Sequence, residues 1–355
     1  MNGMMNGTMN AAVLHAPADL RYERVNVPAI REDEALVRVR AAGVCGSDLG
    51  RVMKTGTYRF PTIPGHEFCG EVAAVGAAVQ GVRVGDRVAV APILPCLDCE
   101  FCASGDYGLC DRYNYLGSRT DGGFAQFVAA PAKNLIPLPD SLSFAEGAMI
   151  EPAAVTLHGM MRVGVNAGET VAVLGCGTIG LFAIQFAKIM GATRVIATDV
   201  APDKLELAAR VGADVCIDSA ARDAVERIRE LTGGRGADVA IETAGVVQTQ
   251  EQTLRAVRKK GRVLLLGTAH RDVVLPPKSF ENIVRYELTL VGSWNSYSAP
   301  FPGAEWRATV EYAKSGALKL APLITHRYPL SEAPTVFVDL AARAYPFTKV
   351  MFEIE

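Results

Sequence analysis

The sequence predicts an α/β protein with two domains, an irregular β-barrel and a doubly wound parallel sheet. The chain has 355 residues, which exceeds the usual size of one compact unit. Its first ~150 residues contain short Val- and Ala-rich runs separated by Gly and Pro, a pattern typical of short strands joined by turns. From Glu169 onward, apolar runs of strand length alternate with helical stretches. This alternation indicates a parallel sheet that is covered by helices on both faces.

The elements of both domains follow from the apolar runs and the turn residues between them. In the first domain, strands are expected at 35–44, 71–79, 87–91 and 125–130. In the second domain, strands are expected at 170–174, 194–198, 215–217, 237–242, 262–266 and 288–291. Helices are expected at 178–190, which is apolar nearly all round, and at 202–211. The N-terminal stretch MNGMMNGTMN is interpreted as a flexible tail.

The composition excludes several classes of protein. The 36 Lys and Arg residues are balanced by 38 Asp and Glu residues, so bulk charge cannot hold this protein to nucleic acid. No apolar run approaches the ~18 residues of a membrane span. The N-terminus lacks the basic and apolar regions of a secretory signal, so we expect a cytoplasmic protein that uses neither membrane nor nucleic acid as a partner.

Four of the eight cysteines fall in one short stretch, with two-residue gaps between the first three. They are Cys96, Cys99, Cys102 and Cys110. Four thiolates complete a tetrahedral zinc shell with no open position, so this zinc would be structural and would fold a lobe over 95–112. The alternatives are redox pairs, chance clustering and an iron–sulfur cluster, whose usual spacing differs from this one.

A glycine-rich turn predicts a dinucleotide site. The strand at 170–174 leads directly into GCGTIG, and the following residues form a helix. The glycines permit a tight turn and close approach of a pyrophosphate, which the free N–H groups of the helix N-terminus then bind. An acid at the end of the next strand would accept hydrogen bonds from a ribose and repel a 2′-phosphate, which favours NAD over NADP. The alternative is a structural turn with an acid that caps a helix. The expected cofactor residues are Gly175, Gly177, Thr178, Ile179, Gly180, Asp199 and, with a weaker signal, Gly267.

Three further ligand types are scattered along the first domain. Cys45, His66 and Glu151 each have an ordinary explanation, as a small core residue, a core histidine and an acid at a helix start. Taken together beside a dinucleotide fold, they fit a catalytic zinc site, in which three protein ligands leave a fourth position open. A thiolate, an imidazole and a carboxylate would leave that ion able to act as a Lewis acid toward an alcohol oxygen.

These motifs, in this order, resemble the zinc-dependent medium-chain dehydrogenase/reductase family over nearly the whole chain. Glu151 and the stretches CGSDL, GSRTDGGFA and GSWNSYSAP resemble the polyol dehydrogenase branch, and most closely its galactitol-1-phosphate 5-dehydrogenase subgroup. The resemblance implies a GroES-like catalytic domain at 1–155 and 295–355 and a Rossmann domain at 156–294. It implies two zinc ions per chain, with catalytic zinc on Cys45, His66 and Glu151, and with Glu67 as a partner or exchanging ligand. It also implies a homodimer or homotetramer.

The sequence departs from the family at the proton relay. Many members carry a histidine five residues after the first zinc ligand, where this chain has Gly50. A relay through Ser47 would then reach solvent through water or an acid such as Glu67 or Glu151. Trp294 and Asn295 follow the last sheet strand and are candidate substrate contacts; interdomain packing is the alternative for Trp294.

The expected activity is therefore the reversible, zinc- and NAD-dependent oxidation of a secondary hydroxyl of a polyol or sugar-alcohol phosphate to the ketone, in carbohydrate metabolism. Four cations flank the metal motifs and are either solvated or hold a substrate phosphate, namely Arg51, Lys54, Arg59 and Arg119. Two other functions compete with this one. The first is a zinc-independent quinone or enone reductase of the same fold, and the second is an NAD-binding scaffold with one structural zinc.

Overall fold

The computed structural model describes residues 7–355 and divides into two compact units. Of the described residues, the first unit comprises 7–151, Tyr297–Lys314 and Leu320–Glu355, and the second comprises Pro152–Ser296 and Ser315–Lys319. These divisions fall within a few residues of the predicted boundaries at 155 and 295, and they add a short return segment to the second unit. No helix within residues 7–355 is long and apolar enough to cross a membrane.

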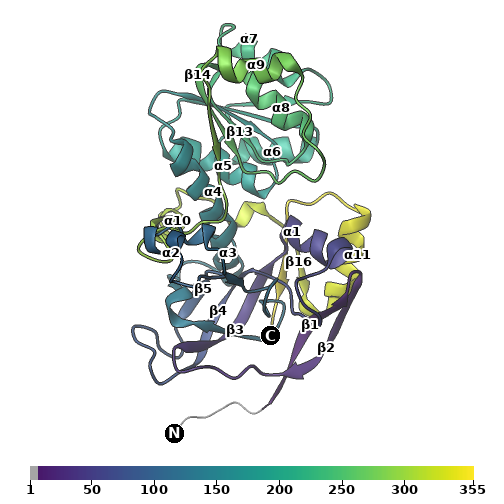
Figure 1. Ribbon diagram of the computed structural model, residues 1–355. Coiled ribbons are helices and arrows are strands. Elements are labelled where there is room, and N and C mark those ends of the chain that lie inside the picture. Colours follow the sequence, from purple (N-terminus) through teal and green to yellow (C-terminus); the bar gives the residue numbers. More distant parts are fainter. Residues whose placement is uncertain (1–6) are drawn as a thin grey trace. The chain divides into compact units, whose positions relative to one another are not determined.

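The first unit is built on a seven-stranded sheet that curls into an irregular barrel (Figure 1). Its strands run in the order β16-β17-β3-β4-β5-β9, and β8 pairs with β3. The bounds are β3 Glu34–Gly43, β4 Glu67–Val75, β5 Arg87–Val90, β8 Phe127–Pro131, β9 Leu135–Pro137, β16 Ile324–Pro329 and β17 Lys349–Glu353. Two smaller ribbons join β1 Thr8–Ala16 to β2 Asp19–Asn26 and β6 Ile93–Leu94 to β7 Asn114–Tyr115.

Two predictions for this unit were wrong. The expected tail includes residues 8–10, which lie in β1, where Asn10 pairs with Arg24 and its N–H donates to Gln126 Oε1 at 2.8 Å; residues 1–6 of that tail lie outside the described residues. The strand expected at 71–79 begins at Glu67 and ends at Val75. The start of this strand was not predicted because the residues Gly-His-Glu resemble a turn, and polar residues seldom begin a buried strand.

The first unit also contains helices. They are α1 Gly46–Gly50, α2 Glu100–Ser104, α3 Phe144–Ala148, α10 Ala304–Lys314 and α11 Ala333–Ala342. The core of this unit is largely aliphatic and includes a group of phenylalanines: the ring of Phe124 lies 5.3 Å from that of Phe352 and 5.8 Å from that of Phe337. Phe124 also fills the space beside Gly65, whose φ of +93° only glycine adopts easily.

The second unit is a doubly wound, six-stranded parallel sheet with the strand order β12-β11-β10-β13-β14-β15. This is the order of the dinucleotide-binding Rossmann fold, and it creates a switch point beside β10. The strands are β10 Thr170–Leu174, β11 Arg194–Asp199, β12 Val215–Asp218, β13 Ala237–Glu242, β14 Val257–Leu265 and β15 Thr289–Gly292. The helices are α4 Ile150–Val163, which begins in the first unit, α5 Thr178–Ile189, α6 Pro202–Val211, α7 Ala224–Leu231, α8 Val247–Ala256 and α9 Pro277–Arg285.

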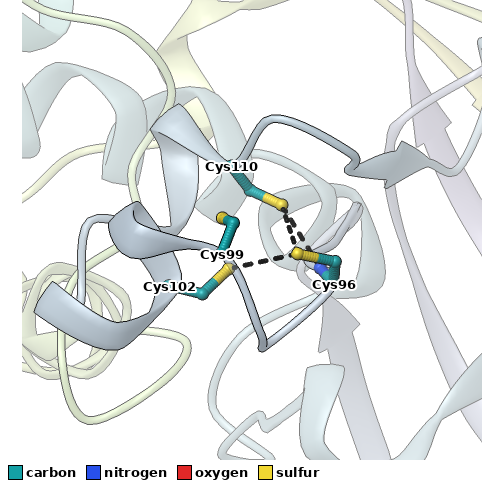
Figure 2. Close-up of side chains that lie close together, drawn as sticks. All are labelled: Cys96, Cys99, Cys102 and Cys110. Atoms are coloured by element: carbon teal, nitrogen blue, oxygen red, sulfur yellow. Dashed lines mark hydrogen bonds between the residues drawn. The ribbon is translucent and has the colours of Figure 1, made fainter.

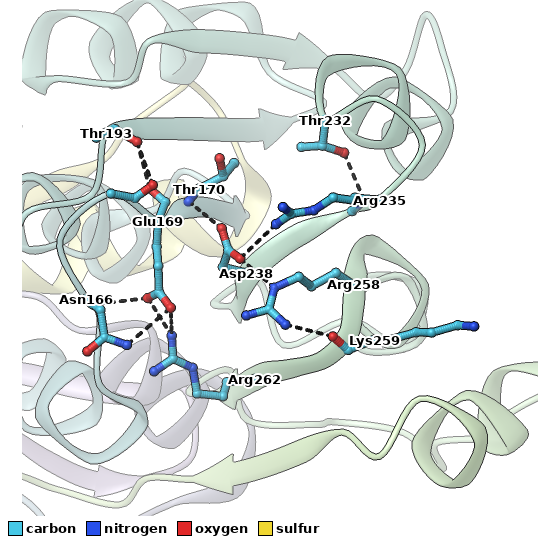
Figure 3. A network of polar contacts seen from close by, with 12 residues as sticks. Asn166, Glu169, Thr170, Thr193, Thr232, Arg235, Asp238, Arg258, Lys259 and Arg262 are labelled. Atoms are coloured by element: carbon cyan, nitrogen blue, oxygen red, sulfur yellow. Dashed lines mark hydrogen bonds and ion pairs between the residues drawn. The ribbon is translucent and has the colours of Figure 1, made fainter.

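A polar network fixes the register of β10, β13 and β14 at their amino ends (Figure 3). Asp238 accepts the N–H of Thr170 at 2.8 Å and pairs with Arg258 at 2.5 Å. Nearby, Glu169 forms an ion pair with Arg262 and accepts the N–H of Asn166 at 2.8 Å. The network therefore ties the amino ends of neighbouring strands to one another.

Candidate functional site

The four clustered cysteines converge on one point (Figure 2). Their sulfur atoms all lie within 4.8 Å of one another, with Cys96 Sγ 3.4 Å from Cys110 Sγ and 3.9 Å from Cys102 Sγ. A tetrahedral zinc with Zn–S bonds of about 2.3 Å places its sulfurs about 3.8 Å apart. The four thiols therefore fit a structural zinc ion, and the iron–sulfur alternative has no support beyond the residue type.

Local backbone geometry prepares the lobe for a cation. Cys99 is the N-cap of α2, and Gly105, in the left-handed conformation, ends the helix. Backbone N–H groups of Cys102 and Asp111 lower the pKa of Cys99 to about 6, whereas burial raises the pKa of Cys102 to about 12. An ion that binds here must therefore displace protons, as zinc does from thiols.

A second cluster joins residues from two separate segments of the first unit. Single ligand atoms of Cys45, His66 and Glu67 lie within 4.8 Å of one another. Cys45 caps α1, and His66 and Glu67 stand at the start of β4, so both segments are held by the barrel. His66 and Glu67 are buried. A soft thiolate, an imidazole and a carboxylate at this spacing are a donor set that zinc accepts.

Asp48 orients the imidazole of His66. Asp48 Oδ1 lies 3.0 Å from His66 Nδ1, and Arg51 lies 3.5 Å from the same oxygen. This contact leaves Nε2 of His66 to face the cluster, an arrangement that is common for zinc-binding histidines. Burial alone would lower the pKa of His66, but the charge of Asp48 raises it well above its ordinary value. The sequence contained Asp48 in the CGSDL stretch, but gave no sign of its role.

Lys349 holds the carboxylate of Glu67 from the other side. Its Nζ lies 2.6 Å from Glu67 Oε2 and donates to the carbonyl oxygen of Val44 at 3.1 Å. Burial would lower the pKa of Lys349, but the charges of Glu67 and Cys45 raise it above its ordinary value. No local sequence pattern predicts this contact, because Lys349 lies on β17, far from Glu67 along the chain.

Glu151 is a buried neighbour of the second cluster and lies outside its 4.8 Å set. It stands in the first turn of α4, and Tyr115 donates its hydroxyl to Glu151 Oε1 at 3.3 Å. Burial raises the pKa of Glu151 to about 7, although the charge of His66 opposes the shift. The assignment of Glu151 as the third zinc ligand stays a prediction, as does the role of Glu67.

Ser47 lies beside the cluster, and its role in a proton relay stays a prediction. Its Oγ donates to Cys45 Sγ at 3.3 Å and accepts from Arg51 Nη1 at 3.0 Å. A side chain at Gly50 would meet no atom within 4 Å, so packing does not explain the glycine at the usual relay position.

The glycine-rich loop has the geometry that a pyrophosphate requires. Gly175 has a φ of +102°, and a Cβ added there would lie 2.9 Å from Ala244. A Cβ at Gly180 would collide with the carbonyl oxygen of Gly175, whereas one at Gly177 would meet nothing within 4 Å. The first and third glycines therefore allow close packing, and the second keeps the backbone open at the N-terminus of α5, where Thr178 and Ile179 follow.

Asp199 ends β11 and reaches back to this loop. Its Oδ2 accepts the N–H of Cys176 at 2.7 Å, and its Oδ1 accepts the N–H groups of Val200 and Ala201 at 2.8 and 3.0 Å. The carboxylate therefore braces the turn, and its contact with a cofactor ribose stays a prediction. The two interpretations made from the sequence, ribose binding and local capping, are compatible.

Three remaining predicted residues lie in the second unit. Gly267 follows β14, donates to the Glu242 carbonyl oxygen at 3.1 Å, and has no room for a side chain between Glu242 and Gly245. Trp294 is half exposed, and Asn295 adopts a left-handed conformation with its Nδ2 buried and unpaired among the described residues. Their proposed contacts with cofactor and substrate stay predictions.

Comparisons with known proteins agree with both units. The alcohol dehydrogenase GroES-like domain family matches residues 31–140, and the zinc-binding dehydrogenase family matches residues 178–313. Galactitol 1-phosphate 5-dehydrogenase of Escherichia coli (strain K12) is 38% identical over 339 residues, which cover 95% of this chain and 98% of that protein. Sorbitol dehydrogenase of Bacillus subtilis (strain 168) is 37% identical over 347 residues, covering 96% and 94%.

Solved structures also match nearly the whole chain. The crystal structure of galactitol-1-phosphate dehydrogenase from Escherichia coli matches with a TM-score of 0.92 and 38% identity, and covers 97% of this chain and 100% of that one. A putative zinc-binding dehydrogenase from Sinorhizobium meliloti 1021, bound to NADP, matches with a TM-score of 0.90 and 34% identity, covering 98% and 99%.

Proposed function

Since the chain belongs to the zinc-dependent medium-chain dehydrogenase/reductase family, and is thus an enzyme of the alcohol and polyol dehydrogenase type, we propose that it oxidises a secondary hydroxyl of a polyol or polyol phosphate to the ketone, reversibly and with NAD. The observation that carries this proposal is the convergence of Cys45, His66 and Glu67 within 4.8 Å, beside the buried acid Glu151. With the four-cysteine lobe, this gives two zinc ions per chain.

We assign the catalytic ion to Cys45, His66 and Glu151, with Glu67 as an exchanging partner. Two features support this choice. One oxygen of Glu67 already accepts a hydrogen bond from Lys349, which makes that oxygen less available to bind a metal. Glu151, by contrast, is buried with a raised pKa and one neutral hydroxyl partner, so a nearby cation would ionise it.

Zinc, when bound, supplies Lewis acidity to the substrate oxygen, and NAD supplies the acceptor for hydride. The chain's own residues orient these groups and move the proton. Asp48 holds the imidazole of His66 in one orientation, and Arg51 holds the Ser47 hydroxyl beside Cys45. Ser47 Oγ receives the proton of the alcohol and passes its own onward, by way of water or an acid such as Glu151, because Gly50 offers no relay group.

Asp199 supports NAD rather than NADP as the cofactor. Its carboxylate is fixed by three backbone N–H groups and cannot swing away from a ribose bound at the end of β11. A fixed negative charge there repels a 2′-phosphate. A relative of this chain was crystallised with NADP, so the preference is a property of this residue rather than of the fold.

We further propose that the chain forms a homodimer or homotetramer in the cytoplasm. Strand β15 is an edge of the parallel sheet, and apolar side chains beside it are exposed, among them Phe280, Val284 and Leu290. An uncovered apolar edge strand is a site of strand pairing. All eight cysteines are free, as expected in a reducing compartment. Light scattering after size exclusion measures the oligomeric state.

The decisive experiment combines metal analysis with a substrate screen. We expect two zinc ions per chain and NAD-dependent formation of NADH with polyols or polyol phosphates, and we expect activity to disappear on chelation and return with zinc. A single zinc per chain, with turnover that survives chelation, would instead support the zinc-independent reductase. The absence of NADH formation with every alcohol in the panel would support the scaffold.

A further inference from the structure

Arg119 is clamped between two tyrosine rings. Its Cζ lies 4.3 Å from the ring centroid of Tyr58 and 4.4 Å from that of Tyr113. Aromatic rings that lie over a guanidinium are attracted to its charge and displace water from it. The N–H donors, however, lie in the plane of the guanidinium and point outward along its edge. The two rings therefore hold Arg119 in place and leave its in-plane N–H donors for hydrogen bonding.

The guanidinium has no counter-charge. Across residues 7–355, no carboxylate forms an ion pair with Arg119, and its Nε is buried without a hydrogen-bond partner. Asp121 is the nearest acid in the sequence, but it pairs with Arg59 at 2.9 Å and accepts the N–H of Ile63 at 3.0 Å. Burying part of a cation without a neighbouring anion costs free energy. The unpaired guanidinium therefore indicates a ligand that supplies the missing negative charge.

The other cations near the metal motifs are occupied or unrestrained. Arg51 is bound to Ser47 and lies 3.5 Å from Asp48. Arg59 is paired with Asp121, and Lys54 is exposed. The sequence made four cations candidates for binding a phosphate. Among these four, only Arg119 is both held in place and without a negatively charged partner.

The loop that carries Arg119 is fixed to the metal site. A Cβ at Gly117 or Gly122 would collide with the carbonyl oxygen of Gly65, and Gly123 donates its N–H to that oxygen at 2.7 Å. Gly65 directly precedes His66. The glycines of this loop thus bring it against the backbone that directly precedes His66, with no space for a side chain between them.

Tyr115 completes the link between the clamp and the metal site. Its carbonyl oxygen accepts the N–H groups of Arg119 and Thr120 at 3.0 and 3.1 Å. Its ring lies 6.2 Å from the ring of Tyr113, which covers Arg119, and 5.8 Å from the ring of His66. The ring of Tyr115 therefore lies next to the clamp on one side and next to a metal-site histidine on the other.

We propose that Arg119 binds the phosphate group of the substrate and so makes this enzyme select a polyol phosphate over the free polyol. A phosphate monoester offers several oxygens to the in-plane N–H groups of the clamped guanidinium, which suits bidentate recognition. This inference rests on the proposed function, because it names the substrate class of that site. It makes Arg119 a specificity residue and leaves the hydride chemistry to the metal cluster.

The test compares galactitol 1-phosphate with galactitol, each with NAD, in the wild type and in two variants. Arg119→Gln should lower the ratio of their kcat/KM values ~10- to 100-fold, the range expected when a hydrogen bond between charged groups is lost. Arg59→Gln is the matched control, since this arginine is already neutralised by Asp121. That control should leave the ratio within ~2-fold of the wild type, which is typical of an exposed pair.

Calorimetric titration of galactitol 1-phosphate without NAD gives a second readout. Arg119→Gln should weaken this binding, and Arg119→Lys should restore only part of it, because lysine lacks the planar fork. Equal losses with both substrates in Arg119→Gln would show that the clamp is purely structural, and would overturn the inference.

The two proposals fail in different ways. Wild-type oxidation of several polyols with no gain from a phosphate would overturn the role of Arg119 and leave the proposed function standing. Binding of galactitol 1-phosphate that depends on Arg119, without NADH formation from any polyol or polyol phosphate, would overturn the proposed function and support the role of Arg119.

Discussion

The carboxylate of Glu67 and the ammonium of Lys349 form a buried ion pair, with 2.6 Å between Oε2 and Nζ. Both side chains are almost fully removed from solvent, at 2% and 3% exposed. Lys349 also donates to the carbonyl oxygen of Val44, which directly precedes Cys45. A single lysine of β17 therefore braces both segments that supply the metal cluster.

Lys349→Met should destabilise the protein by about 3–5 kcal/mol, because it leaves the buried charge of Glu67 unpaired. Thermal unfolding measures the loss. The matched control is the double variant Glu67→Gln with Lys349→Met, which removes both charges and should recover much of the stability. A single variant as stable as the wild type would show that Glu67 is neutral in the native protein.

Glu151→Ala should lower kcat/KM more than ~100-fold, since residues that only support a metal ligand already cost 10- to 100-fold. The affinity for NAD should hold, because Glu151 belongs to the first unit and the glycine-rich loop to the second. Tyr115→Phe is the comparison, as it removes only the 3.3 Å hydrogen bond to Glu151. Normal turnover in Glu151→Ala would remove that residue from the site and leave Glu67 as the third ligand.

Asp199→Ala should weaken NAD binding and reduce the preference for NAD over NADP ~10- to 100-fold in kcat/KM, through the loss of a charged hydrogen-bond acceptor. Asp199→Asn separates the two roles of this residue. It removes the charge and keeps a single acceptor oxygen, which can hold the N–H groups of Val200 and Ala201 but not that of Cys176 as well, so discrimination should fall while the loop keeps part of its bracing. An unchanged cofactor preference in both variants contradicts the ribose assignment.

Cys102→Ser should reduce the zinc content from two ions per chain to one and lower the unfolding temperature of the lobe. Structural zinc contributes its binding free energy directly to folding, so the effect is on stability rather than on the hydride step. Cys216→Ser is the control, a half-buried thiol of the second unit that belongs to neither cluster. Two zinc ions retained in Cys102→Ser would argue against the four-sulfur site.

Asp238→Asn should destabilise the second unit by ~1–2 kcal/mol at pH 7, as hydrogen bonds to charged groups do. Burial would raise the pKa of Asp238, but the N–H of Thr170 and the charge of Arg258 outweigh it and lower the pKa below its ordinary value. The stabilisation is therefore present above about pH 4 and is lost as the pH falls through the lower, folded-state pKa. Unfolding temperatures of the two proteins should converge in acid, and a constant difference down to pH 3 would contradict this sign.

The sequence predicted best those elements whose signals are local. The strands 170–174 and 237–242 and the helix 202–211 have the expected bounds, because apolar runs and turn residues mark both ends. The glycine-rich loop was predictable for the same reason. The contacts of Glu67 with Lys349 and of Glu151 with Tyr115 were not, since 282 and 36 residues separate the partners. No periodicity reports which distant strands become neighbours, and so the choice between Glu67 and Glu151 as zinc ligand lay beyond the sequence.

The position of Lys349 on β17 also sets an order of assembly during protein synthesis. The second unit is almost continuous in the chain, so its sheet has most of its strands available as soon as they leave the ribosome. The barrel must wait for β17, which pairs with β3 and carries the partner of Glu67. Until then the growing polypeptide holds a cysteine, a histidine and an acid whose neutralising lysine has not yet been translated. A metal ion held by Cys45, His66 and Glu67 would therefore have its full set of charged neighbours only after β17 has paired with β3.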